Sequence, residues 1–279
     1  MEARNVVRDP SQTSERLKAE EPSLGCRRLG TAKTAQRHWR DPMNRIELIG
    51  APFSSYVWVV RMALEEKGVP YDLVPAAMHS PEVLAIHPFG KIPVMRHGDL
   101  ALCESKAITT YIDKTFSGPK LIPDDARGSA EVEQWVSLVN TTIDPCLIRT
   151  YLFAYLIPRG AGGQPDRAAI DAVLPAMQQQ IHVLDRAVGS TGYLAGDSFS
   201  LADIYLLPVL HLVQRGPEGA EMVQSTRNLS AYFTTHARRR SYRASLPPPP
   251  TAEAVAAIRK AVSEKRGGGA NPADGARAD

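Results

Sequence analysis

Residues 46–74 read IELIGAPFSSYVWVVRMALEEKGVPYDLV, and they set the architecture of the first half of the chain. Ile46–Ile49 is a short apolar run typical of a buried strand, and turn residues follow it. Ser54–Lys67 then carries apolar residues at helical spacing and stops at Gly68, a residue that commonly ends helices. Tyr71–Val74 is a second apolar run. The stretch therefore predicts a strand–helix–strand unit.

The residues that follow extend this unit. Pro81–Ile86 is expected to form a short helix. Ile92–Arg96 and Leu100–Leu102 are expected to form strands, because they flank the turn residues His97-Gly98-Asp99. A further helix is predicted at Glu104–Phe116. These elements complete a small α/β domain.

Helical periodicity dominates from Arg127 to Ser241. Helices are expected at Val132–Ile157, which contains Pro145, and at Arg167–Val188, Leu201–Gln214 and Asn228–Arg240. An α/β region followed by an all-α region indicates two small domains packed on each other. We expect the α/β domain at residues 43–118 and the all-α domain at residues 127–246.

The two ends of the sequence differ from this body. Residues 1–42 lack apolar periodicity and are expected to be disordered, or not translated at all, with Met43 as the start. A mitochondrial presequence is the alternative, although such segments are poor in acids and this one has six acidic residues. Residues 247–279 are expected to form a linker that opens with Pro247–Pro250, and a flexible tail with a short helix at Ala252–Lys265.

Composition excludes several classes of protein. Hydrophobic residues make up 43% and charged residues 23% of the 279, as in ordinary globular chains. No run approaches the ~18 consecutive apolar residues of a membrane-spanning helix. The net charge of +3 comes from residues 1–42, which hold nine basic and six acidic residues. A neutral body predicts no binding to nucleic acid or to an anionic membrane.

Cysteine and histidine content points to a protein without disulfides or a resident metal. Three cysteines are too few for a disulfide framework, and the seven histidines form no metal-binding signature. The cytoplasm is the expected compartment.

Candidate binding residues stand where predicted helices and strands begin. The backbone N–H groups at a helix start favour an anion, and the Ser54 hydroxyl could donate a hydrogen bond to it. Alternatively, Ser54 only caps the helix. Pro93, after Lys91-Ile92, fits an edge strand or a cis peptide bond. Ser105 could hold a carboxylate and Glu104 an ammonium group, or both could simply begin a helix.

Ser200-Leu-Ala-Asp203 precedes a run of apolar residues and has the pattern of a capping box. We therefore expect Asp203 to support folding rather than catalysis.

The order and spacing of these motifs resemble the soluble glutathione S-transferases. The runs GAPFSSYVWVVRMALEEKGVPYDLV, HSPEVLAIHPFGKIPVM and DLALCESKAITTYI resemble their amino-terminal domain, and GDSFSLADIYLLPVL resembles the capping motif of their helical domain. The resemblance covers about residues 44–246 and implies a thioredoxin-like α/β domain followed by an all-α domain. It points to a serine-type member, phi-, theta- or zeta-like, of bacterial or fungal style.

The resemblance also implies a site for the co-substrate glutathione. Ser54 matches the serine that stabilises the glutathione thiolate, and Ser55 would replace it if the register were off by one. Thiol-transferring relatives carry a cysteine at this position, so disulfide exchange through a protein thiol is not expected. Cys103 is expected to be buried and unreactive.

The other units of the tripeptide would meet residues further along the chain. Glu104 and Ser105 would hold the γ-glutamyl ammonium and carboxylate. The backbone of Ile92, before a cis Pro93, would pair with the cysteinyl unit. Lys91 and His79 would lie near the glycyl carboxylate, and no metal is implied.

The activity implied is conjugation of glutathione to hydrophobic electrophiles by a homodimer, as in detoxification. The second substrate would lie against the helical domain, where an aromatic and apolar set is either a pocket lining or ordinary core or dimer-contact residues: Trp135, Val139, Tyr151, Phe153 and Tyr155. Isomerisation, reductive dehalogenation or ether cleavage at the same glutathione site is one alternative. A non-catalytic binding module of the same fold is the other.

Overall fold

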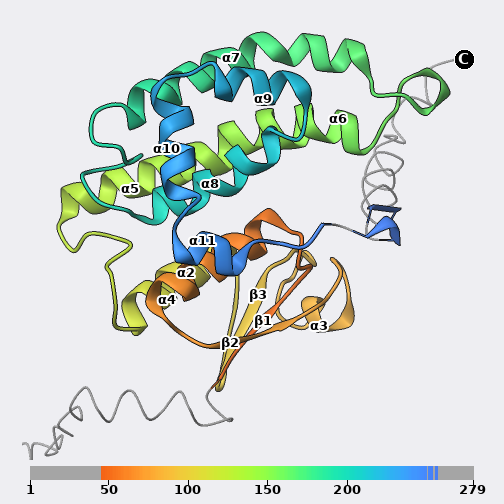
Figure 1. Ribbon diagram of the computed structural model, residues 1–279. Helices are drawn as coiled ribbons and strands as arrows, with labels where there is room; N and C mark the ends of the chain where they lie inside the picture. The colour runs from red at the N-terminus through yellow and green to blue at the C-terminus, as the bar shows by residue number, and fades with distance from the viewer. Residues whose placement is uncertain (1–44, 250, 254, 257–279) are drawn as a thin grey trace, which may run out of the picture. The chain divides into compact units, whose positions relative to one another are not determined.

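The stretch at residues 46–74 forms strand β1 (Ile46–Ile49), helix α2 (Ser55–Lys67) and strand β2 (Tyr71–Val74) in the computed structural model (Figure 1). β1 and β2 pair in parallel, as a strand–helix–strand crossover requires. The structure describes residues 45–249, 251–253, 255 and 256, all within the unit Asp41–Asp279. The predictions for residues 1–42, for Met43 and for most of the helix at Ala252–Lys265 lie outside the described residues.

Helix α2 begins and ends where the sequence predicts. Ser54 is its N-cap, and Gly68 ends it in the left-handed region at a φ of 64°, which glycine adopts without a steric cost. Val57, Val60 and Leu64, on the side of the helix that meets the core, are completely buried.

A mixed sheet forms the rest of the α/β half. Its other elements are α3 (Pro81–Leu84), β3 (Val94–His97), β4 (Leu100–Cys103) and α4 (Ser105–Thr115). The strand order is β2-β1-β3-β4, with β3 antiparallel to both of its neighbours. Side chains alternate along β1, so Ile46 and Leu48 join the core with α2 and α4, while Ile49 packs with Val83 of α3. This is the thioredoxin-like arrangement that the resemblance implied.

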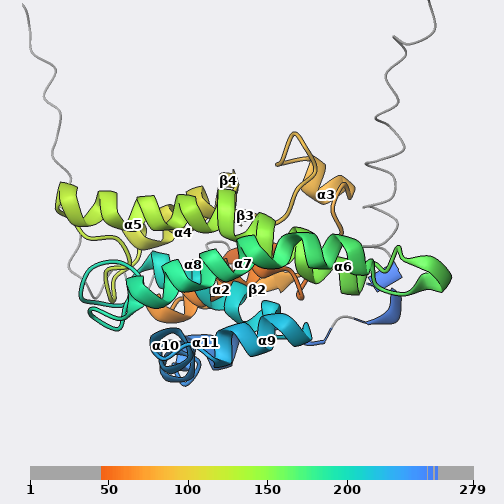
Figure 2. The same ribbon diagram turned by 90° about the horizontal axis from the view of Figure 1, so that it is seen from above.

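Helices make up the second half. They are α5 (Ala126–Leu138), α6 (Phe153–Leu156), the 3₁₀ turn η4 (Ala161–Gly163), α7 (Arg167–Val188), α8 (Leu201–Val213), α9 (Pro217–Gln224), α10 (Asn228–His236) and α11 (Arg240–Ser245). They stack on the side of the sheet that α2 and α4 cover (Figure 1), and Figure 2 shows them from above. Among the described residues, no helix has the length and apolar character needed to cross a bilayer.

Helix α8 is the buried centre of this half. The Asp203 carboxylate accepts hydrogen bonds from the backbone N–H groups of Ser200 and Leu194 and from the Tyr232 hydroxyl, each at 2.8 Å. Asp203 is fully buried and thereby ties the start of α8 to the preceding loop and to α10. The predicted capping box is confirmed.

The long helix predicted at Val132–Ile157 differs from the structure. It starts earlier, at Ala126, and widens into π-helical segments at Val139–Ile143 and Pro145–Leu152. Pro145 has no N–H to donate to a carbonyl one α-turn back. The Asp144 N–H bonds instead to the carbonyl of Val139, five residues earlier, which is the π-helical pattern.

Helix α9 was not predicted. Only Gly219 and Val223 of its eight residues are buried, and one of the two is a glycine, so its sequence gives a weak apolar signal. The helix predicted at Asn228–Arg240 is also shorter, because the chain turns after His236 and begins α11 at Arg240.

His211 predicts a dependence of stability on pH. Burial, with a contribution from Arg215, lowers the pKa of His211 to about 4, while its ring meets Trp58 edge-on and its Nδ1 lies 2.7 Å from the Tyr242 hydroxyl. In the unfolded chain the His211 ring takes up a proton near pH 6.5, whereas in the folded chain it stays neutral until about pH 4. The free energy of unfolding should therefore fall as the pH drops from 6.5 toward 4. The melting temperature should fall less steeply with pH in His211→Gln than in the wild type. An equal pH dependence in the two proteins would contradict the assignment to His211.

Candidate active site

Ser54 lies at the start of α2, where the helix presents unpaired backbone N–H groups. Its hydroxyl oxygen accepts a hydrogen bond from the Val57 N–H at 3.5 Å. A hydroxyl accepts through its oxygen and still has a proton to donate. The capping role and the anion-binding role, left as alternatives by the sequence, are therefore compatible.

A cavity of about 470 Å³ opens beside Ser54 and Ser55. One wall comes from the α/β half, and the other from the π-helical segment, α6 and the end of α8. Its other lining residues are mostly apolar: Phe53, Tyr56, Met78, Lys91, Ile92, Asp144, Ile148, Arg149, Leu152, Phe153, Leu156, Leu212, Arg215, Pro247 and Pro248.

A second, more polar cavity of about 220 Å³ adjoins the first. It is lined by Lys91, Ile92, Pro93, Glu104 and Ser105, together with Tyr56, His87, Lys106 and Asn140. Tyr56, Lys91 and Ile92 line both cavities, so the two are neighbours. The structure thus brings together all the predicted site residues except His79.

The backbone has unusual geometry at two of these positions. The Ile92–Pro93 peptide bond is cis, as the resemblance implied. Glu104 has a positive φ of 68°, which is rare for a residue with a Cβ and typical of functional sites. The Glu104 side chain remains 64% exposed at the cavity.

A buried histidine stands behind Glu104. The His87 ring accepts the Phe89 backbone N–H at its Nδ1, at 3.0 Å, and its Nε2 lies 3.2 Å from Oε1 of Glu104. Because Nδ1 is the acceptor, the proton sits on Nε2 and is donated to the carboxylate. Sequence reasoning missed this contact, because no local pattern relates His87 to Glu104.

A buried tyrosine stands behind Ser105. The Tyr205 hydroxyl, on α8, donates to Oγ of Ser105 at 2.9 Å. Burial raises the pKa of Tyr205, so it stays a neutral donor. With its oxygen occupied, Ser105 has its own proton free for a ligand. No local signal in the sequence links these two residues.

Tyr56 lies against the ion pair of Asp144 and Arg149, which come from just before and from within the π-helical segment Pro145–Leu152. Arg149 donates from Nε to Asp144 at 2.8 Å, and its guanidinium lies over the Tyr56 ring at 5.5 Å. Burial, then the Asp144 charge, raises the pKa of Tyr56 to about 12. Tyr56 is therefore a protonated phenol at neutral pH and no base.

Three further expectations concern His79, Cys103 and a metal site. His79 lies in an exposed turn with its N–H on the Gly90 carbonyl, and it lines neither cavity. Cys103 is half-buried rather than buried, packed near the Ile49 and Val83 side chains. No group of His, Cys, Asp and Glu within the described part of the chain is arranged to hold a metal ion.

Only one member of the aromatic and apolar set lines the large cavity, and that residue is Phe153. Tyr151 and Tyr155 both donate hydrogen bonds to Glu218, at 2.9 and 2.6 Å. Val139 is buried, and Trp135 packs against the core. None of these four lines either cavity, which counts against the pocket interpretation for them.

Comparison with known proteins connects this geometry to a family. The model of the glutathione S-transferase N-terminal domain matches residues 48–120, and that of the C-terminal domain matches residues 143–240. Glutathione S-transferase 3 of Zea mays is 32% identical over an alignment of 226 residues that covers 76% of this chain and 100% of the relative. This chain belongs to the glutathione S-transferase family.

Solved structures of the family agree. Glutathione S-transferase I of maize, in complex with an atrazine glutathione conjugate, is 29% identical, covers 77% of this chain and 98% of its own, and superposes with a TM-score of 0.65. A glutathione S-transferase of Methylobacillus flagellatus with glutathione bound is 26% identical, covers 73% and 100%, and has a TM-score of 0.62.

The two family domains contribute different walls of the site. Ser54, Lys91 and Glu104 lie in the first matched range, whereas Asp144 and Arg149 lie in the second. Pro247 and Pro248 line the large cavity from beyond both ranges. In this member of the glutathione S-transferase family, part of the cavity wall therefore comes from a segment that neither domain model covers.

Proposed function

We propose that the protein conjugates glutathione to hydrophobic electrophiles, with Ser54 stabilising the glutathione thiolate. The observation that carries this proposal is the Ser54 hydroxyl at the start of α2, beside a largely apolar cavity of about 470 Å³. The maize and Methylobacillus structures, which hold a glutathione conjugate and glutathione, support it.

The second cavity holds the tripeptide in this proposal. Glu104 meets the γ-glutamyl ammonium and Ser105 its carboxylate, and the backbone of Ile92, before the cis Pro93, pairs with the cysteinyl unit. Lys91 meets the glycyl carboxylate. This places the sulfur toward Ser54 and the larger cavity.

The chemistry follows from the ionisation of the thiol. A free thiol has a pKa near ~8.5, so only a few per cent is thiolate at neutral pH. A hydroxyl donor and the helix start together could lower this by about two units, or ~2.7 kcal/mol. The proton goes to solvent, the sulfur forms a bond to the electrophilic carbon, and the leaving group departs with its electron pair. The protein supplies ionisation and position.

Two measurements test the proposal together. The purified chain should be retained on immobilised glutathione, and it should conjugate 1-chloro-2,4-dinitrobenzene with release of chloride. Retention without turnover of this or any other activated electrophile would overturn the enzymatic assignment and favour a binding module.

We also propose a homodimer in the cytoplasm. The family resemblance supports the dimer, and the unpaired Cys103 and Cys146 fit a reducing compartment. Light scattering should give twice the 30.4 kDa of one chain; a single-chain mass would contradict the dimer.

His87 should control the affinity for glutathione. His87→Phe keeps a ring but removes the Nε2–H that steadies the Glu104 carboxylate, so the KM for glutathione should rise about tenfold, the worth of one hydrogen bond to a charged group. The kcat at saturating glutathione should change far less. His87→Gln, which retains a donor, should recover part of the affinity, and an unchanged KM in His87→Phe would refute the contact's role.

A further inference from the structure

The large cavity carries more positive than negative charge. Its charged lining residues are Lys91, Asp144, Arg149 and Arg215. Asp144 and Arg149 neutralise each other through hydrogen bonds of 2.8 and 3.4 Å. Lys91 belongs to the glutathione site in the proposed function. The fourth, Arg215, makes no side-chain hydrogen bond or ion pair with any residue that the structure describes.

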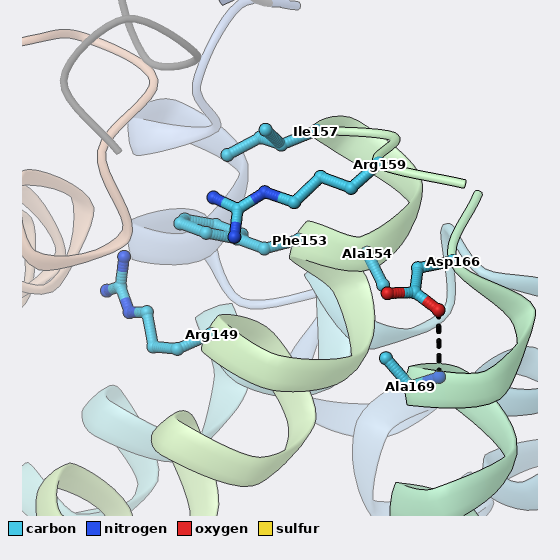
Figure 3. Close-up of a pocket in the computed structure, with 7 residues that line it drawn as sticks. All are labelled: Arg149, Phe153, Ala154, Ile157, Arg159, Asp166 and Ala169. Atoms are coloured by element: carbon cyan, nitrogen blue, oxygen red, sulfur yellow. Dashed lines mark hydrogen bonds between the residues drawn. The ribbon is translucent and has the colours of Figure 1, made fainter. Parts of the chain in front are cut away.

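A smaller hollow of about 140 Å³ continues the cavity past Phe153. Arg149 and Phe153 line both spaces, and Arg159, Asp166 and Ala169 are among the residues that line the hollow. Figure 3 shows the Arg159 guanidinium beside the Phe153 ring, with Asp166 directed to the Ala169 N–H instead. Arg159, like Arg215, has no acidic partner in the described part of the chain.

These two arginines lie on adjoining spaces, Arg215 on the large cavity and Arg159 on the smaller hollow, which share Arg149 and Phe153. We propose that the electrophile carries a carboxylate or sulfonate apart from its reacting carbon, and that Arg159 and Arg215 bind this group. The inference rests on the proposed function. Both arginines are exposed, so the selectivity comes from the guanidinium fork, which matches such an anion with paired hydrogen bonds.

A matched pair of substrates isolates the charge. 4-Chloro-3,5-dinitrobenzoate and its methyl ester share the ring, the reacting carbon and the leaving chloride. The quantity to measure is the ratio of kcat/KM for the acid to kcat/KM for the ester. Comparing this ratio between proteins cancels both the intrinsic reactivity of each substrate and any loss of active protein.

The ratio should fall at least tenfold in R159Q/R215Q, and each single variant shows the share of its arginine. R186Q/R227Q removes the same charge from exposed arginines that line neither cavity, and its ratio should match the wild type. Turnover of both substrates with an unchanged ratio in R159Q/R215Q, or an equal fall in the control, would overturn this inference alone. If the wild type conjugates 1-chloro-2,4-dinitrobenzene but neither of these substrates, this inference alone is overturned. Absence of turnover with all three would overturn the proposed function itself.

Discussion

Ser54→Ala is expected to lower kcat/KM for conjugation by close to a hundredfold at pH 6, with a smaller loss at higher pH. The methyl group cannot donate to the sulfur, so the bound thiol should return toward its ordinary pKa of about 8.5. The thiolate fraction then differs most below pH 7, and the two proteins should converge above about pH 9. Steady-state rates from pH 6 to 9, with ultraviolet titration of the bound thiolate, measure this directly.

Ser55→Ala is the matched control, because Ser55 lines the same cavity one residue later. It should keep most of its activity. The Ser54 cap bond is long, at 3.5 Å, so its loss should cost at most about 1 kcal/mol of stability and cannot account for the rate. If Ser55→Ala loses turnover and Ser54→Ala does not, the thiolate is held by Ser55.

Asp203→Ala is expected to destabilise the protein by about 3–5 kcal/mol, because it removes three buried hydrogen bonds and each buried donor left unpaired costs roughly 1–3 kcal/mol. The change would leave the buried Leu194 N–H and Tyr232 hydroxyl without their acceptor. A loss of this size should lower the melting temperature by about 10 °C in a body of this length. Urea unfolding at neutral pH measures the free energy.

Asp203→Asn keeps the size of the side chain and one acceptor oxygen. It should therefore lose less stability than Asp203→Ala. Both variants should still conjugate at low temperature in their folded fraction, because Asp203 lines neither cavity. A stable but inactive Asp203→Ala would show that the residue takes part in the chemistry after all.

Local signals explain what could be predicted. Gly68 marked a helix end, His97-Gly98-Asp99 marked a hairpin, and Ser54 marked a helix start, because each acts through its own or neighbouring backbone. These signals sufficed for the α/β half, whereas the proposed glutathione site came from the resemblance of the motifs, taken together, to a known family.

Contacts between distant residues could not be predicted in this way. His87 and Glu104 are 17 residues apart, and Tyr205 and Ser105 are 100 apart, so no spacing rule relates them. Asp144 and Arg149 are separated by five residues, which puts them off the shared face of an α-helix. They meet because the helix is π-helical there, and Pro145 alone did not reveal that widening.

The hydrogen bond from Tyr205 to Ser105 limits how the two family domains can be recombined. A chimera that joined this α/β half to a relative's helical half without a tyrosine at the place of Tyr205 would lack the donor behind Ser105. Modular exchange would thus weaken tripeptide capture even though every predicted ligand-binding side chain lay on the retained half. Domain shuffling in this lineage has to preserve that pairing or replace it.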